Sequence, residues 1–444
     1  MDSNEGVVVI GGGVAGLTTA ATLAEAGVDV TVVEREETVG GRVKSRDVDG
    51  FTIDRGFQVL FEAYPALRAE LDLDALDLRP FAPGAVICRP GSRSTLADPF
   101  RDPVAAIGSI LDPTIPFRDK FRTLLLRREL TRRSESDSFT GPDETIRTFL
   151  RERGFSARYI DRFVEPFYGG ITLDRSLSSS SHVFEYTFRA MSRGRIAVPA
   201  DGMGSIPRQL ADRAEAGGGE IRTGTAVERI DLVGSDVDGG DVTDRHDQPE
   251  TSEGVRITCA DGTSLSASAA VVATSPPEAR RLTGIEAIPT EGVGCVTQWY
   301  TLPAERSFEV GTRILLNAGS ERPNAVIPIG EVAPSYAPED RTLFAATFVD
   351  DEALEREADA LAQETREALA SWYPERAVNG LRPIAIDRTP FAQFAQPPGF
   401  RKELPNPDDP AGPIVLAGDY TRWSSLQGAV ESGRRANTIV REHL

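Results

Sequence analysis

Histidine, cysteine and methionine are scarce in this chain of 444 residues, with 3 of each. Cys88, Cys259 and Cys295 lie far apart and form no CxxC pair, and an odd number of thiols cannot pair completely. This usage is typical of a reducing compartment and contains no zinc-binding pattern. The histidines are equally scattered and form no HExxH motif, so we predict no metal site.

Long apolar runs are also missing. No stretch approaches the roughly 18 residues that a membrane-spanning helix requires. Residues 1–5 lack the basic start of a secretory signal peptide. We therefore expect a cytoplasmic protein that is, at most, peripheral to the inner face of a membrane.

Acidic residues outnumber basic ones. The chain has 49 Lys and Arg and 68 Asp and Glu, which gives a net charge of −19. Such a chain repels the phosphate backbone that supplies most non-specific affinity for nucleic acids, so we expect no nucleic-acid partner. Dense carboxylates retain water at high salt, which suggests a halophilic source. The alternative is an ordinary acidic, arginine-biased protein from a GC-rich genome.

The N-terminal region carries a nucleotide-binding pattern. A β-branched run over 7–10 predicts a buried strand, and it leads into GxGxxG at 11–16. A helix over 17–26 and a second strand over 28–33 follow, and this strand ends at Glu34. This order of elements indicates a Rossmann-like, NAD(P)-binding-like dinucleotide site: a strand, a glycine turn, a helix, a second strand and an acidic residue.

Each residue type in this pattern has a physical role. Gly11 permits the tight turn, Gly13 lets the backbone approach a pyrophosphate, and Gly16 lets the helix pack on the strand. The helix N-terminus offers free N–H groups to phosphate. Glu34 would accept hydrogen bonds from ribose hydroxyls, which favours FAD or NAD over NADP. We place Val14, Ala15 and Arg35 in the same site.

Further segments carry a family resemblance. The sequence has Gly40-Gly41-Arg42, then Ala417-Gly418-Asp419-Tyr420-Thr421 near the C-terminus, then Gln427-Gly428-Ala429. Together these resemble the flavin-dependent amine oxidase and phytoene desaturase superfamily, which includes protoporphyrinogen oxidases. The resemblance implies FAD. It places Gly40, Gly41 and Arg42 along the pyrophosphate, Gly418 and Asp419 at the ribityl or pyrophosphate region, and Gln427, Gly428 and Ala429 at the flavin ring.

The resemblance extends over most of the chain and implies its architecture. Residues 200–207 and 270–277 resemble segments that return to the FAD domain, and the backbone of Val227 would meet the adenine. We expect an α/β fold, in which a discontinuous Rossmann-like FAD domain accompanies an α+β substrate domain with a mixed sheet and a helical subdomain. The expected boundaries are 1–60, 195–280 and 385–444 for the FAD domain, and 61–194 and 281–384 for the substrate domain, whose helical part covers about 100–190. Residues 234–254 lack a hydrophobic period and predict a solvated hairpin extension.

Two absences argue against amine oxidation. Amine oxidases often place a lysine near flavin N5, but the lysines here are Lys44, Lys120 and Lys402, none of them in the middle strands around 295–320. The aromatic ring that such enzymes carry before the last motif is replaced by Ser424-Ser425-Leu426, although Trp423 is close. By contrast, residues 56–65 resemble the plant-type phytoene desaturase pattern, with Gln58 where that group has histidine. We expect Gly56, Phe57 and Gln58 near the flavin ring.

The expected function is therefore an FAD-dependent oxidoreductase that dehydrogenates or desaturates a small lipophilic substrate, with a phytoene-like carotenoid precursor favoured. The resemblance implies hydride transfer to flavin N5 and reoxidation by a quinone or O2. A protoporphyrinogen or amine oxidase and a non-catalytic FAD-bound scaffold remain alternatives. No catalytic base is assigned. The candidates for an apolar substrate tunnel are Tyr168, Trp299, Phe391 and Trp423.

One segment opposes the overall acidity. Residues 118–133 contain seven basic and two acidic residues, a net charge of +5, interleaved with Phe and Leu. A basic amphipathic helix of this kind, preceded by an apolar run over 104–111, could lie on an anionic membrane surface, with a contact over 104–133. A solvated helix whose arginines pair with nearby carboxylates is the alternative.

Overall fold

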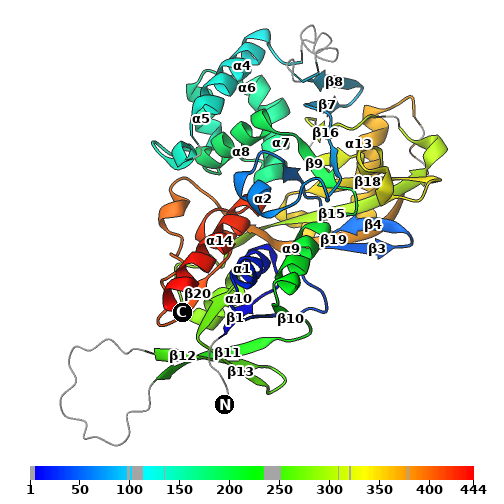
Figure 1. The fold of residues 1–444 in the computed structure, drawn as a ribbon. Coiled ribbons are helices and arrows are strands. Elements are labelled where there is room, and N and C mark those ends of the chain that lie inside the picture. Colours follow the sequence, from blue (N-terminus) through cyan, green and yellow to red (C-terminus); the bar gives the residue numbers. More distant parts are fainter. Residues whose placement is uncertain are drawn as a thin grey trace, which may run out of the picture.

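The computed structural model describes residues 6–97, 101–102, 114–134, 136–234, 252–308, 310–319, 322–376, 378 and 380–444. Most of the hairpin extension expected over 234–254 lies outside these described residues. Residues 104–113, the first part of the segment 104–133 expected at a membrane, also lie outside them. Figure 1 shows a helical region at the upper end of the molecule and a helix-covered sheet at the lower end, near both termini.

The lower sheet is parallel throughout and draws its strands from widely separated parts of the chain. Its order is β10-β2-β1-β14-β20, with bounds Glu220–Arg222, Val30–Val33, Val7–Ile10, Ala269–Val272 and Ile414–Leu416. Its central strands are buried runs of Val, Ala and Ile, as expected for a parallel sheet covered on both faces.

Three helices pack together beside this sheet, namely α1 (Val14–Glu25), α9 (Ser205–Ala216) and α14 (Leu426–His443). Close approach between α1 and α14 depends on Gly433, because a Cβ there would lie 2.5 Å from Ala15 O. The Thr19 hydroxyl donates to the carbonyl of the same glycine at 3.1 Å. The first and last helices of the chain are thus locked side by side.

A mixed seven-stranded sheet forms the middle of the molecule. Its order is β19-β15-β18-β17-β16-β7-β8, with bounds Arg382–Phe394, Gly292–Pro303, Arg341–Phe348, Ala325–Ile327, Ile314–Asn317, Ala85–Arg89 and Ser92–Leu96. The β16–β7 pair is parallel and the other pairs are antiparallel. Helices α12 (Asp351–Glu355) and α13 (Ala358–Trp372) pack against it.

Smaller elements connect these sheets. They are the sheet β11 (Val227–Gly234), β12 (Ser252–Cys259) and β13 (Ser264–Ala267), the hairpin β3 (Ser45–Val48) and β4 (Phe51–Asp54), the sheet β5 (Leu60–Phe61), β9 (Ile196–Pro199) and β6 (Leu78–Pro80), and the helices α2 (Pro65–Glu70), α10 (Pro276–Thr283) and α11 (Ile329–Val332).

Helices dominate the described residues between 117 and 193. They are α4 (Phe117–Arg132), α5 (Ile146–Glu152), α6 (Ala157–Tyr159), the π-helical turn η2 (Ile160–Val164), α7 (Glu165–Thr172) and α8 (Ser181–Arg193). Together with the two large sheets, they match the expected α/β class with a mixed sheet and a helical part. The exact domain boundaries stay a prediction.

A buried carboxylate connects three of these pieces. Asp54, at the end of β4, accepts hydrogen bonds from Ser45 Oγ at 2.5 Å, Met203 N at 2.9 Å and Tyr336 Oη at 3.2 Å. Burial is the dominant cause that raises its pKa from 3.8 to about 6, against the opposing effect of these donors. Asp54 therefore links the β3–β4 hairpin to the loop before α9 and to the segment after α11.

This raised pKa predicts a pH-dependent stability term. The stabilisation is fully present below the ordinary pKa and is lost as pH rises through about 6, because the folded state holds the proton more tightly. Relative to Asp54→Asn, the wild-type free energy of unfolding should fall by about 3 kcal/mol between about pH 3 and pH 7. Urea unfolding at several pH values measures it. The control Asp261→Asn should show no such fall, because hydrogen bonds from Thr263 lower the pKa of that exposed carboxyl.

Candidate functional site

A cavity of about 760 Å³ opens at the carboxyl ends of the parallel strands and continues beneath the seven-stranded sheet. Open parallel sheets bind ligands at this edge. The predicted cofactor residues line it, with three exceptions. Those lining it are Gly11, Gly13, Val14, Ala15, Glu34, Arg35, Gly40, Gly41, Arg42, Gly56, Phe57, Gln58, Val227, Gly418, Asp419 and Ala429.

The three motif glycines of the first turn have different surroundings. A Cβ on Gly16 would lie 2.1 Å from Gly11 O, and one on Gly11, whose φ is +110°, would lie 2.7 Å from Ala273 O. Gly13 has an extended backbone, with φ −79° and ψ 176°, and its Cβ would meet no atom within 4 Å. Gly11 and Gly16 are therefore required by the fold, whereas Gly13 only keeps the cavity open.

Glu34 is held in place by backbone donors. Its Oε2 accepts from Gly12 N at 2.7 Å and its Oε1 from Glu36 N at 2.8 Å, and the residue is largely buried. A carboxylate has about four lone-pair sites, so acceptor capacity remains for two ribose hydroxyls. The side chain lines the cavity at the end of β2.

Arg42 and Asp419 form an ion pair across the cavity wall. Arg42 donates to Asp419 Oδ1 at 2.7 Å and to Ala392 O at 2.9 Å, while Ser424 Oγ donates to Asp419 Oδ2 at 2.9 Å. Gln58 Nε2 donates to the Arg42 carbonyl at 2.8 Å. The predicted motifs at 40–42, 56–58 and 418–419 thus meet at one point.

The remaining predicted cofactor residues, Gly16, Gln427 and Gly428, do not line the cavity. Gln427 is buried and accepts from Ala66 N at 3.0 Å, at the start of α2. A Cβ on Gly428 would lie 2.1 Å from Trp423 O, so this glycine permits the tight turn that begins α14. The Gln427 side chain therefore holds the start of α2, and the two glycines allow close backbone contacts.

The other half of the cavity is mainly apolar. Its apolar lining comes mainly from α7, α8, β9, β15, β16, β17 and β19, and includes Phe167, Ile171, Leu173, Val183, Ile196, Cys295, Ile314, Leu316, Ala325, Pro390 and Phe391. The uncharged polar residues Thr187, Thr297, Asn324, Thr347, Thr389, Gln393 and Gln396 and the cation Arg388 also line it. The acidic lining residues, Glu34, Glu36, Glu278 and Asp419, all sit with the nucleotide-binding motifs. Among the described lining residues there is no lysine or histidine.

Of the four tunnel candidates, Phe391 and Trp423 line the cavity, and Tyr168 and Trp299 do not. Trp299 is fully buried and donates from Nε1 to Asp387 Oδ2 at 3.1 Å. Tyr168 is buried against Phe184, whereas its neighbour Phe167 lines the cavity. Adjacent helical residues point about 100° apart, so only the orientation of α7 distinguishes these two rings.

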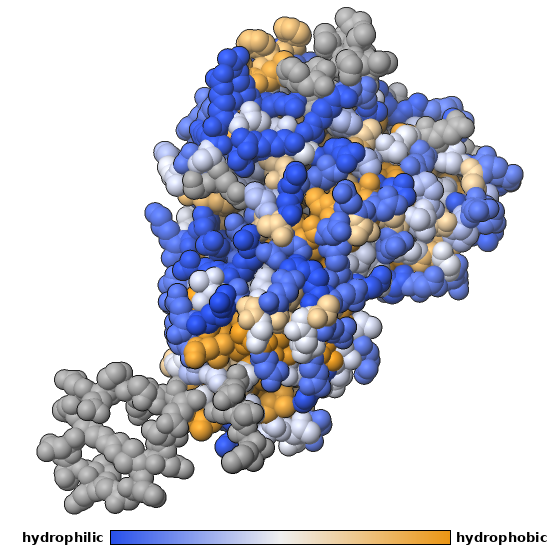
Figure 2. Space-filling view, viewed as in Figure 1, coloured by the Kyte–Doolittle hydropathy of each residue, from blue (hydrophilic) through white to orange (hydrophobic). Residues whose placement is uncertain are grey.

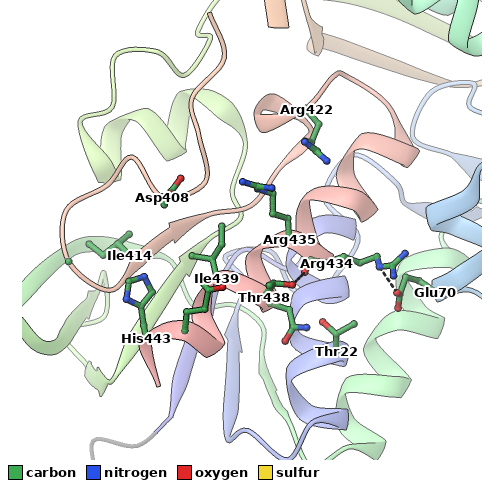
Figure 3. Close-up of a pocket in the computed structure, with 13 residues that line it drawn as sticks. Thr22, Glu70, Asp408, Ile414, Arg422, Arg434, Arg435, Thr438, Ile439 and His443 are labelled. Atoms are coloured by element: carbon green, nitrogen blue, oxygen red, sulfur yellow. Dashed lines mark hydrogen bonds and ion pairs between the residues drawn. The ribbon is translucent and has the colours of Figure 1, made fainter. Parts of the chain in front are cut away.

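A second pocket, of about 880 Å³, lies along the outer side of α14 (Figure 3). Three arginines, Arg422, Arg434 and Arg435, line it together with Glu70, Asp408 and Glu442. Arg434 pairs with Glu70 at 3.1 Å. Charges of both signs balance here and none of the nucleotide-binding motifs reaches it, so we assign the chemistry to the first cavity.

The model of the family described as flavin containing amine oxidoreductase matches residues 14–440. The chain belongs to this family. The protein is accordingly an FAD-dependent oxidoreductase, which confirms the expected cofactor and enzyme class.

Curated relatives of this flavoprotein include oxidases and carotenoid desaturases. Protoporphyrinogen oxidase 2 of Arabidopsis thaliana is 29% identical over 183 residues, covering 41% of this chain and 35% of the relative. Carotenoid 3,4-desaturase of Haloarcula japonica is 50% identical over 54 residues, covering 12% and 11%. These matches span well under two thirds of the relatives' lengths. The 15-cis-phytoene desaturase of Solanum lycopersicum is 22% identical over 484 aligned positions, covering 98% and 78%.

Solved structures share the fold of the flavoprotein. An oxidoreductase from Methanosarcina mazei superposes with a TM-score of 0.73 at 17% identity, covering 97% of this chain and 99% of that one. Cyclohexylamine oxidase from Brevibacterium oxydans gives 0.69 at 18% identity, covering 99% of both chains. Within the described residues, no helix is both long and apolar enough to span a membrane.

The residues present fit FAD. The space in front of Gly13 is open, Glu34 is pre-oriented for ribose, and the α1 N-terminus begins at the cavity. We expect Gly13→Val to fold normally, because its backbone is extended and its Cβ meets nothing, yet to lose FAD. Flavin absorbance per protein after purification, together with the melting temperature of the apoprotein, measures both effects.

Two further variants separate binding from folding. Glu34→Ala should also lower FAD occupancy, since it removes the ribose acceptor. Gly16→Val should instead unfold the protein, because its side chain would overlap Gly11 O. Full flavin occupancy in both Gly13→Val and Glu34→Ala would contradict the assigned site.

Proposed function

We propose that this oxidoreductase desaturates a lipophilic polyene of the carotenoid-precursor class. The observation that carries the proposal is the apolar substrate half of the cavity, which holds no carboxylate to balance an ammonium group. The carotenoid desaturases among the relatives support this substrate class.

The groups near the substrate half are poorly suited to acid–base work. Burial raises the pKa of the Cys295 thiol to about 11, so it stays protonated near neutral pH. Burial likewise raises the pKa of the Tyr64 hydroxyl. Desaturation needs little more, because the substrate loses a hydride and a proton, and the proton can leave to water. Bound FAD supplies the hydride acceptor.

The residues around the substrate half would then serve mainly to orient the substrate. Phe57 N donates to Thr297 Oγ1 at 3.1 Å, which ties the loop over 56–58 to strand β15 where both line the cavity. Ile171, Leu316 and Phe391 provide apolar walls that would hold a polyene in one position over the reacting ring. We place the FAD domain at 1–60, 195–280 and 385–444, and propose a quinone or O2 as electron acceptor.

Anaerobic mixing tests the substrate class. A phytoene-like polyene in detergent micelles should bleach the flavin absorbance, whereas primary amines should not. Bleaching by amines alone would overturn the proposal, and bleaching by a porphyrinogen alone would assign the alternative oxidase reaction. A flavin that no donor class reduces would indicate a non-catalytic scaffold.

Filling the apolar half should block the polyene selectively. Ile171→Trp places a large ring in the cavity from α7 and should slow flavin reduction by polyene at least tenfold, with FAD occupancy unchanged. The matched control, Ile439→Trp, lines the separate outer pocket and should leave the rate unaltered. Equal rates for both variants would show that substrate does not occupy this half.

A further inference from the structure

Helix α4 exposes an apolar stripe to solvent. The exposed fractions of Phe117, Phe121 and Leu125 are 68%, 53% and 52%. Their spacing of four residues places them on one face of the helix. Among the described residues, the other large apolar side chains that are exposed are Leu232 and Leu444, which lie apart from this helix in the chain. Figure 2 shows hydrophobic residues at the upper end of the molecule, where Figure 1 places α4.

Unpaired arginines surround the stripe. Within the described part of the chain, Arg118, Arg128 and Arg132 are exposed and no carboxylate lies within 4.0 Å of them. By contrast, Arg122 pairs with Asp119 at 3.7 Å, and Arg133 pairs with Glu129 at 2.6 Å. The solvated, ion-paired alternative therefore describes only part of this segment.

The opposite face of α4 is firmly anchored. Leu126 and Leu130 are buried in the helical region. Asp119 is fully buried and accepts from Ser156 N at 3.0 Å and Ser156 Oγ at 2.5 Å, where α6 begins. The stripe is thus held outward, since rotation of the helix to hide it would break these contacts.

We propose that α4 docks on the surface of an anionic lipid bilayer. The apolar side chains Phe117, Phe121 and Leu125 match the acyl layer of such a surface, and the three exposed arginines beside them match its headgroups. A nucleic acid would suit the charge but not the apolar stripe, and this face is locally positive on a chain of net charge −19. The inference deepens the proposed function, because a lipophilic polyene resides in the bilayer.

A row of aromatic rings connects α4 with the cavity. Tyr159 is hydrogen-bonded to Thr123 of α4, with 3.0 Å between the two oxygens. From Tyr159 the rings continue to Phe163 and Phe167, with centroid separations of 5.5 Å at each step. Phe163 and Phe167 are half-buried, and Phe167 lines the cavity. This row runs from the anchored face of α4, behind the exposed stripe, to the substrate half of the cavity.

Vesicle sedimentation of the FAD-loaded protein tests the docking. At about 0.1 M salt, where the Debye length is about 10 Å, the protein should pellet with vesicles containing phosphatidylglycerol and remain unbound with pure phosphatidylcholine. The double variants Phe117→Ser/Phe121→Ser and Arg118→Glu/Arg128→Glu should each bind at least about tenfold more weakly. Flavin content checks that both variants are folded.

Matched controls lie elsewhere on the surface. Leu232→Ser removes an exposed leucine from β11, and Arg208→Glu/Arg441→Glu reverses two exposed arginines on α9 and α14, so neither should change vesicle binding. Failure to pellet with anionic vesicles would overturn the docking, as would a stripe-dependent dimer in solution. Sedimentation requires no turnover, so its outcome is independent of whether polyenes reduce the flavin.

Discussion

The ion pair between Arg42 and Asp419 is the contact on which the cofactor site depends. Asp419 is almost completely buried whereas Arg42 is partly exposed, so removal of the Arg42 guanidinium would leave a buried carboxylate without its ion-pair partner, which is destabilising. The pair joins the segment after β2 to the segment after β20, 377 positions apart in the chain. Ser424, Gln58 and the carbonyl of Ala392 attach to it. The motifs at 40–42 and 418–419 thereby form one wall of the cavity.

The acidity of the chain and its affinity for a phosphate-bearing cofactor are compatible because they act at different places. Backbone N–H groups at the glycine turn and the start of α1 provide local positive potential without basic side chains. Carboxylates that line the nucleotide half accept hydrogen bonds, as Glu34 does from the backbone N–H groups of Gly12 and Glu36. The substrate half contains no acid, so the two halves of one cavity have different chemistry.

Most of the residues that the sequence predicts for the nucleotide half line one cavity, and their signals are local. The roles of Gly11 and Gly16 follow from backbone sterics within one βα turn, and the structure shows the close approaches they permit. Of the four residues predicted for the substrate half, two line the cavity and two do not. Phe167 lines the cavity where Tyr168 was expected, and Trp299 is tied to Asp387 in the core. The side chain of Gln427, predicted near the flavin ring, accepts a hydrogen bond from Ala66 N at the start of α2.

The sequence by itself determined a dinucleotide site on a βαβ unit, since spaced glycines, a strand-terminal acid and β-branched runs act over a few residues. The resemblance of its later motifs to a known family implied FAD and the α/β architecture. The tertiary structure alone decided which rings face the cavity, because packing sets the rotation of α7 and the path of β15. It also distinguished the arginines of α4 that pair with carboxylates from those that face solvent. Such a distinction depends on what the rest of the chain places beside the helix, and no local pattern of charge contains that information.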